Sequence, residues 1–263
     1  MSRVTEIRYV GYGVKDFDTE RKFYADDWGL TEVQATDDMA WFKTHGHDEH
    51  HVVRLHKRDS DCVEVIALAA DSRADVDTLR AKVGEAGCKI VHEPRDLDAP
   101  GGGYGFRFFS PDGMPFEISF TDVLGFKVSD WLGDFMCFLR CNEAHHRIAL
   151  LPGPPCLNHV AYDMLTLDDM MRGASRLRKR GTDIRWGPGR HTAGNNTFSY
   201  FCTPAGFAVE YTSELEEVDF ENHQEMVHEP GPQVMDQWET GIGGPQTMPK
   251  PAADPCLFQP SEG

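Results

Sequence analysis

The stretch that decides the fold is residues 155–216, PCLNHVAYDMLTLDDMMRGASRLRKRGTDIRWGPGRHTAGNNTFSYFCTPAGFAVEYTSELE. Its pattern predicts a strand, then a helix, then further strands. His159 lies in the first apolar strand and Glu210 in the last one. A carboxylate in an apolar strand is costly to bury unless it is paired or binds a metal. A His and a Glu on one sheet face would supply two of the three ligands of a 2-His-1-carboxylate iron site.

The first half of the chain predicts the pattern βαβββ twice. Apolar alternation marks its strands, and apolar residues at helical spacing mark its two helices. The predicted elements are strands 7–14, 32–36, 39–43 and 51–56 with helix 16–25, then strands 62–69, 89–92, 105–110 and 115–120 with helix 72–86. We therefore expect an α+β fold of repeated βαβββ units in two domains.

The second half of the chain repeats the first. Shifts of 96 to 93 residues place 38–42 on 134–138, His50-His51 on His145-His146, Cys62 on Cys156, 108–113 on 201–206 and Glu117 on Glu210. Several independent matches at nearly one offset are hard to obtain by chance. In this alignment Val65 is the counterpart of His159. The first copy is therefore expected to have the scaffold without the metal site.

The second copy is incomplete at its start. Its match begins near Thr121, opposite Ala25, so the opening strand and helix at 7–24 have no counterpart. The chain therefore predicts about three and a half units where four are expected. We expect a metal-free N-terminal domain at 1–120, a C-terminal catalytic domain at 121–215 and a tail at 216–263.

Composition excludes several classes of partner. The 263 residues include 43 acids against 26 bases, a net charge of −17, which argues against binding nucleic acid or an anionic membrane surface. The first residues lack the apolar region of a signal peptide, and no apolar run is long enough to span a membrane. Seven scattered cysteines without a CxxC motif indicate reduced thiols and a cytoplasmic protein.

The last segment of the chain has a different composition from the rest. After Glu216 it is acidic and then rich in Pro and Gly, so we expect little regular structure there. We expect a tail draped over the second half of the chain, with disorder as the alternative.

Several short motifs together indicate a family. They are Asp122-Val123-Leu124-Gly125-Phe126, His145-His146-Arg147-Ile148-Ala149-Leu150, Leu157-Asn158-His159-Val160, Gly187-Pro188-Gly189-Arg190-His191, Val209-Glu210-Tyr211 and Gly243-Gly244-Pro245-Gln246. With them the chain resembles the type I extradiol ring-cleavage dioxygenases of the vicinal oxygen chelate superfamily, over nearly its whole length. The resemblance implies Fe(II), with Mn(II) as an alternative, bound by two His and one Glu. His159 resembles the second His and Glu210 the carboxylate.

The resemblance also implies where the first His ligand would lie. In this family it lies on the opening strand of the third unit, and that segment is missing here. The matching place in the first copy is about Tyr9.

The resemblance gives roles to other polar residues. His146, or else His145, resembles the acid/base His near the bound oxygen, because a neutral imidazole takes and returns a proton. His191 resembles a residue that hydrogen-bonds substrate or oxygen, and Tyr200 the phenol near a catechol hydroxyl. Tyr200 and Glu210 lie ten residues apart on adjacent strands, so both could reach one pocket. The further residues expected at the substrate are His145, Asn195 and Asn196.

Structural readings of these residues stay open from the sequence alone. His159 could be a core histidine bonded to a carbonyl, and Glu210 a paired structural carboxylate like Glu117. His145-His146 could be a surface pair, since His50-His51 occupies the same place in the copy without a site.

Two further motifs look chemical but are expected to be structural. The His-rich segment 45–51 lies on a hairpin of the first copy, where it could hold at most an adventitious metal. Gly101-Gly102-Gly103 precedes a strand and is not followed by a GK[ST] signature, so it does not predict a phosphate-binding loop.

These observations predict a cytoplasmic enzyme, expected to be a homo-oligomer, that uses Fe(II) and O2 to cleave a small aromatic diol of the catechol type. One alternative is a metal-poor relative that binds an aromatic ligand without turnover, because one ligand is absent. Another is a glyoxalase-type lyase or isomerase on the same scaffold. The combination of His146, His191 and Tyr200 favours the dioxygenase.

Overall fold

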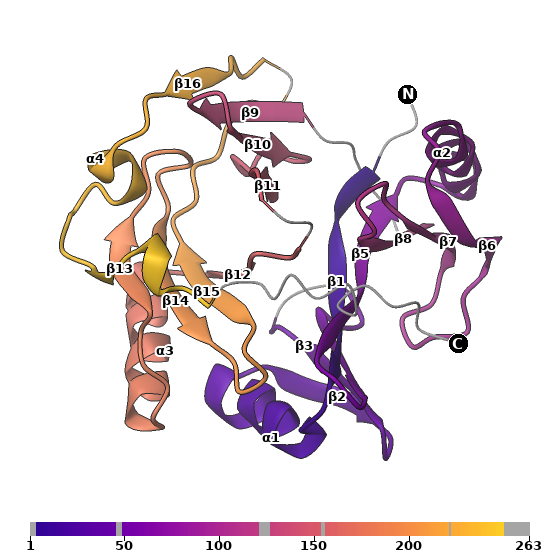
Figure 1. The fold of residues 1–263 in the computed structure, drawn as a ribbon, viewed down its shortest axis with the longest axis horizontal. Helices are drawn as coiled ribbons and strands as arrows, with labels where there is room; N and C mark the ends of the chain where they lie inside the picture. Colours follow the sequence, from indigo (N-terminus) through magenta and orange to yellow (C-terminus); the bar gives the residue numbers. More distant parts are fainter. Residues whose placement is uncertain (1–3, 46–48, 121–126, 154–155, 221, 250–263) are drawn as a thin grey trace. The chain divides into compact units, whose positions relative to one another are not determined.

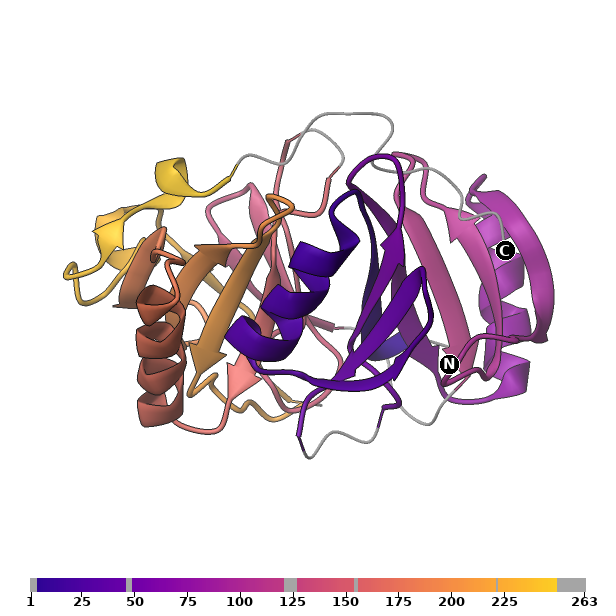
Figure 2. The same cartoon turned by 90° about the horizontal axis from the view of Figure 1, so that it is seen from below.

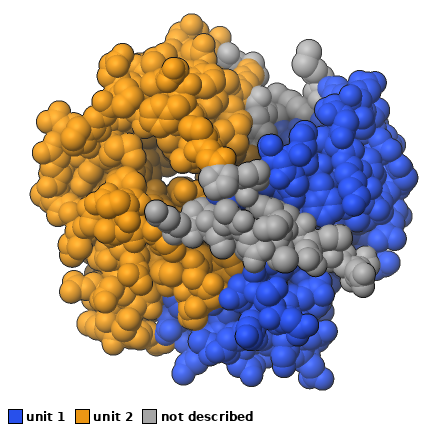
Figure 3. Space-filling view, in the orientation of Figure 1, with its two compact units in different colours: residues 1–126, 154–156, 252–263 blue, residues 127–153, 157–251 orange. Residues whose placement is uncertain are grey.

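The computed structural model describes residues 4–45, 49–120, 127–153, 156–220 and 222–249. The chain is α+β and divides into two compact units, coloured separately in Figure 3. Among the described residues, unit 1 holds 4–120 and Cys156, and unit 2 holds 127–153 and 157–249.

Unit 1 contains two complete βαβββ halves (Figure 1). The first half is β1 (Val4–Val14), α1 (Phe17–Lys22), β2 (Thr31–Ala35), β3 (Met39–Lys43) and β4 (Val53–Lys57), and the second is β5 (Cys62–Ala70), α2 (Arg73–Glu85), β6 (Lys89–Asp96), β7 (Tyr104–Phe109) and β8 (Pro115–Phe120). They form one eight-stranded sheet in the order β2-β3-β4-β1-β5-β8-β7-β6. The two central strands, β1 and β5, pair antiparallel and join the halves. The predicted α+β fold of repeated βαβββ units is confirmed.

One predicted helix has a different form. Residues 16–25 were expected to be a single α-helix, but α1 is followed by a π-helical turn, η1 (Phe23–Trp28). A π-turn brings residues five apart onto one face, and here Phe23 and Trp28 stack with ring centroids 5.9 Å apart. Both side chains and that of Tyr24 are buried. The burial of three large aromatic rings accounts for the wider turn, which a 3.6-residue period does not anticipate.

Unit 2 contains an incomplete third unit and a complete fourth one. The third consists of β9 (Lys127–Leu132), β10 (Met136–Arg140) and β11 (Ile148–Leu150), and the fourth of β12 (Val160–Met164), α3 (Leu167–Lys179), β13 (Trp186–Arg190), β14 (Thr197–Cys202) and β15 (Ala208–Ser213). In unit 1 the order β4-β1-β5 places the opening strand of the first half at the centre of the sheet. In unit 2, β11 and β12 end separate sheets, with no described strand between them. The predicted gap is thus present in the fold.

The segment after Glu216 has more regular structure than we expected. It contains β16 (Met226–His228), α4 (Pro232–Met235), β17 (Ile242–Gly243) and the 3-10 turn η2 (Pro245–Thr247). β16 pairs parallel with β9, and β17 pairs antiparallel with β13. The expectation of little regular structure is therefore wrong for 226–247, whereas the tail does lie along unit 2 (Figure 1). Strands this short take their hydrogen bonds from existing sheet edges, which the local sequence pattern does not reveal. Our expectation for residues 250–263 lies outside the described part.

Helix α3 covers one face of the five-stranded sheet that carries Glu210 (Figure 2). Thr166 caps its N-terminus by accepting a hydrogen bond from the Asp169 amide. Met170, Ala174 and Leu177 form its buried stripe. No helix in the described ranges is long and apolar enough to cross a membrane.

Candidate metal centre

Glu210 of β15 is a buried carboxylate that protein groups leave half satisfied. Tyr200 of β14 lies directly opposite it across the strand pair, so the two side chains share one sheet face, as their spacing predicted. Glu210 is 3% exposed. Within the described residues its Oε1 has no hydrogen-bond partner. A buried carboxylate oxygen in this state is unfavourable unless a cation binds it.

His159 lies just before β12 and faces the carboxylate of Glu210. Its Nε2 lies 3.2 Å from Glu210 Oε2. Its Nδ1 lies 2.8 Å from Asn158 Oδ1, an acceptor, so Nδ1 carries the hydrogen. In neutral His159 the lone pair of Nε2 therefore points toward a carboxylate oxygen. A shared proton or a metal ion relieves that repulsion, and a second residue that fixes the tautomer is typical of metal-bound His. The pair fits a divalent metal.

The equivalent place in unit 1 has no such pair. Glu117 matches Glu210, but Arg107 Nε donates to its Oε2 at 2.8 Å and Tyr9 donates to its Oε1 at 3.2 Å. The residue that matches His159 is Val65, which packs with Tyr9 and Ala67. Unit 1 thus neutralises its carboxylate with an arginine, as expected for a copy without a metal site.

His191 and Tyr200 are joined next to Glu210. His191 Nδ1 donates to the Met235 carbonyl at 2.7 Å, so in the neutral ring Nε2 bears the lone pair. The Tyr200 hydroxyl donates to that nitrogen at 3.3 Å. Burial and the charge of Glu210 raise the pKa of Tyr200 well above its ordinary value. Met235 lies in the tail, so α4 fixes the tautomer of His191.

Aromatic rings surround these polar groups. Trp186 stacks on Tyr200 with centroids 5.1 Å apart and planes at 11°. Phe198 stacks on His191 at 3.9 Å, and His159 meets Tyr200 edge-on at 5.0 Å. This stacking holds the rings of His191 and Tyr200 in place.

His146 is brought near the same group. Burial, with smaller electrostatic contributions from the neighbouring imidazoles and Arg147, lowers its pKa to about 3, so the ring is neutral at physiological pH. Its Nδ1 lies 3.0 Å from Nδ1 of His145, so one of these two nitrogens carries the hydrogen and the other accepts it. His50 and His51 make the same contact at 3.1 Å in unit 1. The His pair is therefore part of the repeated scaffold.

The three residues predicted to contact substrate have other partners. His145 turns Nε2 toward Asp130. Asn195 has a left-handed backbone with φ of 50° and accepts a hydrogen bond from Gln237 at its side-chain oxygen. Asn196 is buried and donates to Thr212. Substrate contact by these residues stays a prediction.

The two motifs expected to be structural, residues 45–51 and Gly101-Gly102-Gly103, have structural partners. Glu49, in the described part of the His-rich segment, forms an ion pair with Arg8, whereas 46–48 lie outside the described residues. The carbonyls of Gly101 and Gly102 accept hydrogen bonds from the same arginine.

The sequence prediction missed Asp130, His223 and His228, which gather in unit 2. Asp130 lies in an ordinary strand pattern, and the two histidines lie in a segment expected to be irregular. The available signal was a pair of histidines five residues apart in an otherwise acidic tail.

Comparison with known proteins agrees with this architecture. Residues 6–118 and 120–211 match the family described as Glyoxalase/Bleomycin resistance protein/Dioxygenase superfamily. The chain is similar to the crystal structure of the Mn(II)-bound glyoxalase from Novosphingobium aromaticivorans, with 63% sequence identity and a TM-score of 0.96, covering 100% of this chain and 99% of that one.

Extradiol dioxygenases are more distant matches. The chain is 26% identical over 273 aligned positions to biphenyl-2,3-diol 1,2-dioxygenase from Paraburkholderia xenovorans, covering 82% of this chain and 90% of that protein. Since 273 positions hold only 82% of 263 residues, that protein has residues inside the matched stretch that this chain lacks. Homoprotocatechuate 2,3-dioxygenase from Arthrobacter globiformis shares the fold, with a TM-score of 0.85, 20% identity and coverage of 95% and 92%.

Proposed function

The chain belongs to the Glyoxalase/Bleomycin resistance protein/Dioxygenase superfamily, and we propose that it is a metal-dependent extradiol dioxygenase that cleaves a catechol-type ring with O2. The observation that carries the proposal is the His159–Glu210 pair, 3.2 Å apart, whose carboxylate has a buried oxygen without a partner among the described residues. The homology to a biphenyl-2,3-diol 1,2-dioxygenase supports ring cleavage.

We infer that Fe(II) is the working metal, with Mn(II) as the alternative that the printed name of the 63% identical relative suggests. A metal bound by His159 and Glu210 would bring a diol and O2 together and pass charge between them. With the opening strand of the third unit absent, these two residues are the protein ligands we assign. Fewer protein ligands leave more positions for substrate and also weaken metal binding.

The remaining residues would orient the substrate and move its proton. His146, whose Nδ1 contacts Nδ1 of His145, would exchange a proton with the diol or the bound oxygen. Tyr200 and His191 form a hydrogen-bonded pair that would contact the diol or oxygen. The rings of Trp186 and Phe198 would exclude water from one side of the ligand. Asn195, Asn196 and His145 complete the set proposed to line the substrate site.

The sequence expectations of a cytoplasmic homo-oligomer, with a metal-free domain at 1–120, a catalytic domain at 121–215 and a tail at 216–263, belong to this proposal.

A glyoxalase-type isomerase is the second candidate, favoured by the name of the 63% identical relative. That chemistry needs a metal and a proton-transferring base but no O2. The same residues, His159, Glu210 and His146, would then serve a hemithioacetal instead of a diol.

Oxygen consumption separates the two candidates. The purified chain would be loaded anaerobically with Fe(II) or Mn(II) and given catechol or 2,3-dihydroxybiphenyl. The proposal predicts one O2 consumed for each diol and a yellow ring-fission product. Anaerobic isomerisation of the hemithioacetal of methylglyoxal and glutathione, without O2 uptake on either diol, would contradict it and establish the second candidate.

A further inference from the structure

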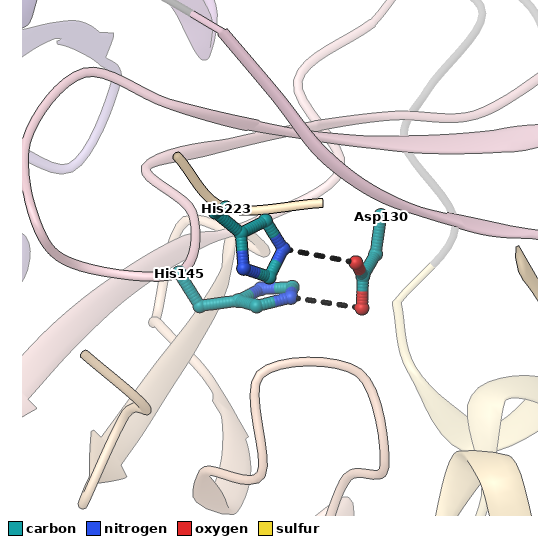
Figure 4. Close-up of side chains that lie close together, drawn as sticks. All are labelled: Asp130, His145 and His223. Atoms are coloured by element: carbon teal, nitrogen blue, oxygen red, sulfur yellow. Dashed lines mark hydrogen bonds and ion pairs between the residues drawn. The ribbon is translucent and has the colours of Figure 1, made fainter. Parts of the chain in front are cut away.

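A second cluster of metal-ligating side chains lies in unit 2 around Asp130 of β9 (Figure 4). His145 Nε2 lies 3.0 Å from Asp130 Oδ2, and His223 Nε2 lies 3.3 Å from Oδ1. One ligand atom from each of the three residues lies within 4.8 Å of the others. Asp130 and His145 are each 1% exposed. The cluster shares no residue with the His159–Glu210 pair.

Its geometry is compatible with a bound cation as well as with hydrogen bonds. At metal–ligand distances of about 2.1 Å, two ligands of a tetrahedral site lie about 3.4 Å apart. The separations of 3.0 Å and 3.3 Å are close to that value. His145 Nε2 is buried and faces the Asp130 carboxylate, with which it pairs when no metal is bound. An imidazole nitrogen and a carboxylate oxygen in these positions could both ligate one cation.

The tail supports the carboxylate from outside. His228 Nε2 lies 2.6 Å from Asp130 Oδ2, and the Met226 amide donates to Oδ1 at 3.0 Å. Burial opposes ionisation, but the imidazoles of His145 and His228 and this amide outweigh it, so the pKa of Asp130 is held below its ordinary value. Metal-ligating carboxylates are commonly oriented by such hydrogen bonds. Without a metal, His223 Nε2 can instead donate to the Ser129 carbonyl, 3.1 Å away.

The sequence repeat shows that the cluster is not shared scaffold. The shift that aligns the two copies places Gln34 opposite Asp130, and His50 opposite His145. His223 and His228 come from the tail, which follows both copies. Unit 1 therefore keeps the His pair without the carboxylate and the tail histidines that would complete a metal site.

We propose that Asp130, His145 and His223 bind a structural divalent cation of the zinc class. Two imidazoles and one carboxylate suit such an ion, and a water molecule would fill the fourth position beside the half-buried His223. His228 acts as a positioning residue through Asp130. The ion would tie the tail to β9 and to the segment before β11. The same tail carries Met235, whose carbonyl fixes the tautomer of His191.

Metal content in matched variants tests the proposal separately from the proposed function. The full chain with Glu210→Gln, which removes one ligand of the other centre, would be stripped of metal and titrated with Zn(II). It is expected to retain one tightly bound equivalent. Adding His223→Gln should remove that equivalent, and adding His228→Gln should weaken binding by about 10-fold to 100-fold. Equal zinc content in E210Q and E210Q/H223Q, or none in E210Q, would overturn the site.

Two further measurements guard against a folding artefact. Circular dichroism compares E210Q/H223Q with the metal-free E210Q chain, so loss of zinc through misfolding is recognised. X-ray absorption of the zinc-loaded E210Q chain reads the ligands without a second substitution. Scattering from two imidazoles is expected, and a shell of oxygen atoms alone would overturn the proposal. Activity does not enter either result.

Discussion

Three buried carboxylates show that neighbours decide what an acid residue does. Glu117 meets an arginine and a tyrosine hydroxyl and is structural. Glu210, at the matching place in the repeat, meets a histidine whose hydrogen is directed to Asn158, and we propose that it binds a cation. Asp130 meets three imidazoles. The residue type is nearly the same in each case, and the charge of the partners differs.

The sequence predicted which side chains lie together where their spacing along paired strands decides it. Glu210 and Tyr200 share a sheet face because adjacent antiparallel strands bring residues ten apart opposite each other across this turn. Asp130 was missed because its partners arrive from a segment about 95 residues later, and no local pattern encodes that contact. The tautomer of His191 depends on a backbone carbonyl of the tail, so it too required the structure.

Acid should destabilise unit 1 through His51. Burial and the positive charges around it lower the pKa of His51 to about 3 from the ordinary 6.5. The unfolded chain therefore binds this proton below about 6.5 and the folded chain only below about 3. The contribution of His51 to the unfolding free energy is fully present above pH 6.5. It falls by about 1.4 kcal/mol per pH unit as the pH drops toward 3.

Urea denaturation at several pH values measures this slope. His51→Phe keeps a ring against Tyr9 and removes the titration, so its unfolding free energy should fall less steeply between pH 6 and pH 4. An unchanged slope would mean that His51 does not titrate as the structure requires.

At the scale of elements, the repeat extends to the helix caps. Ser72 begins α2 by accepting from the Asp75 amide, and Thr166 begins α3 by accepting from the Asp169 amide. The two caps lie 94 residues apart, the shift that aligns the copies there. Side-chain oxygens at this position satisfy amide hydrogens that the first turn leaves free.

Removing either cap should weaken the chain by a similar amount. Ser72→Ala and Thr166→Ala should each lower the unfolding free energy by about 1 kcal/mol, measured by thermal and urea denaturation. Thr78→Ala is the matched control, because that exposed hydroxyl only bonds the Ala74 carbonyl within α2. A loss in the control as large as in the cap variants would contradict the capping argument.

Helices and strands were predicted well wherever the segment has a hydrophobic periodicity of its own. In the first half of the chain the strands and helix α2 were expected close to their observed places, and in 155–216 the order of strand, helix and strands was as expected. The π-turn at 23–28 was missed because buried aromatic rings, rather than backbone period, set its width. The tail strands were missed because two or three residues at an existing sheet edge carry no pattern of their own.

At the scale of the whole molecule, the described residues form one unit with two complete βαβββ halves and a second unit whose first half is incomplete. The opening strand of the third βαβββ unit is absent from the described structure, and the similar chain from Novosphingobium aromaticivorans matches over 100% of this chain. That relative is a Mn(II)-bound protein by its name.

The central claim is that unit 2 alone carries the catalytic metal, through His159 and Glu210. Oxygen uptake by two matched variants tests it most directly, since Glu210→Gln and Glu117→Gln change the same position of the two copies. E117Q breaks a buried ion pair and should lose about 3 kcal/mol of stability, so activity is scaled to the folded fraction. The account predicts that E210Q loses Fe(II)-dependent O2 uptake with a catechol at least about 100-fold while folded E117Q keeps it. Retained uptake in E210Q, or its loss in folded E117Q, would contradict the account.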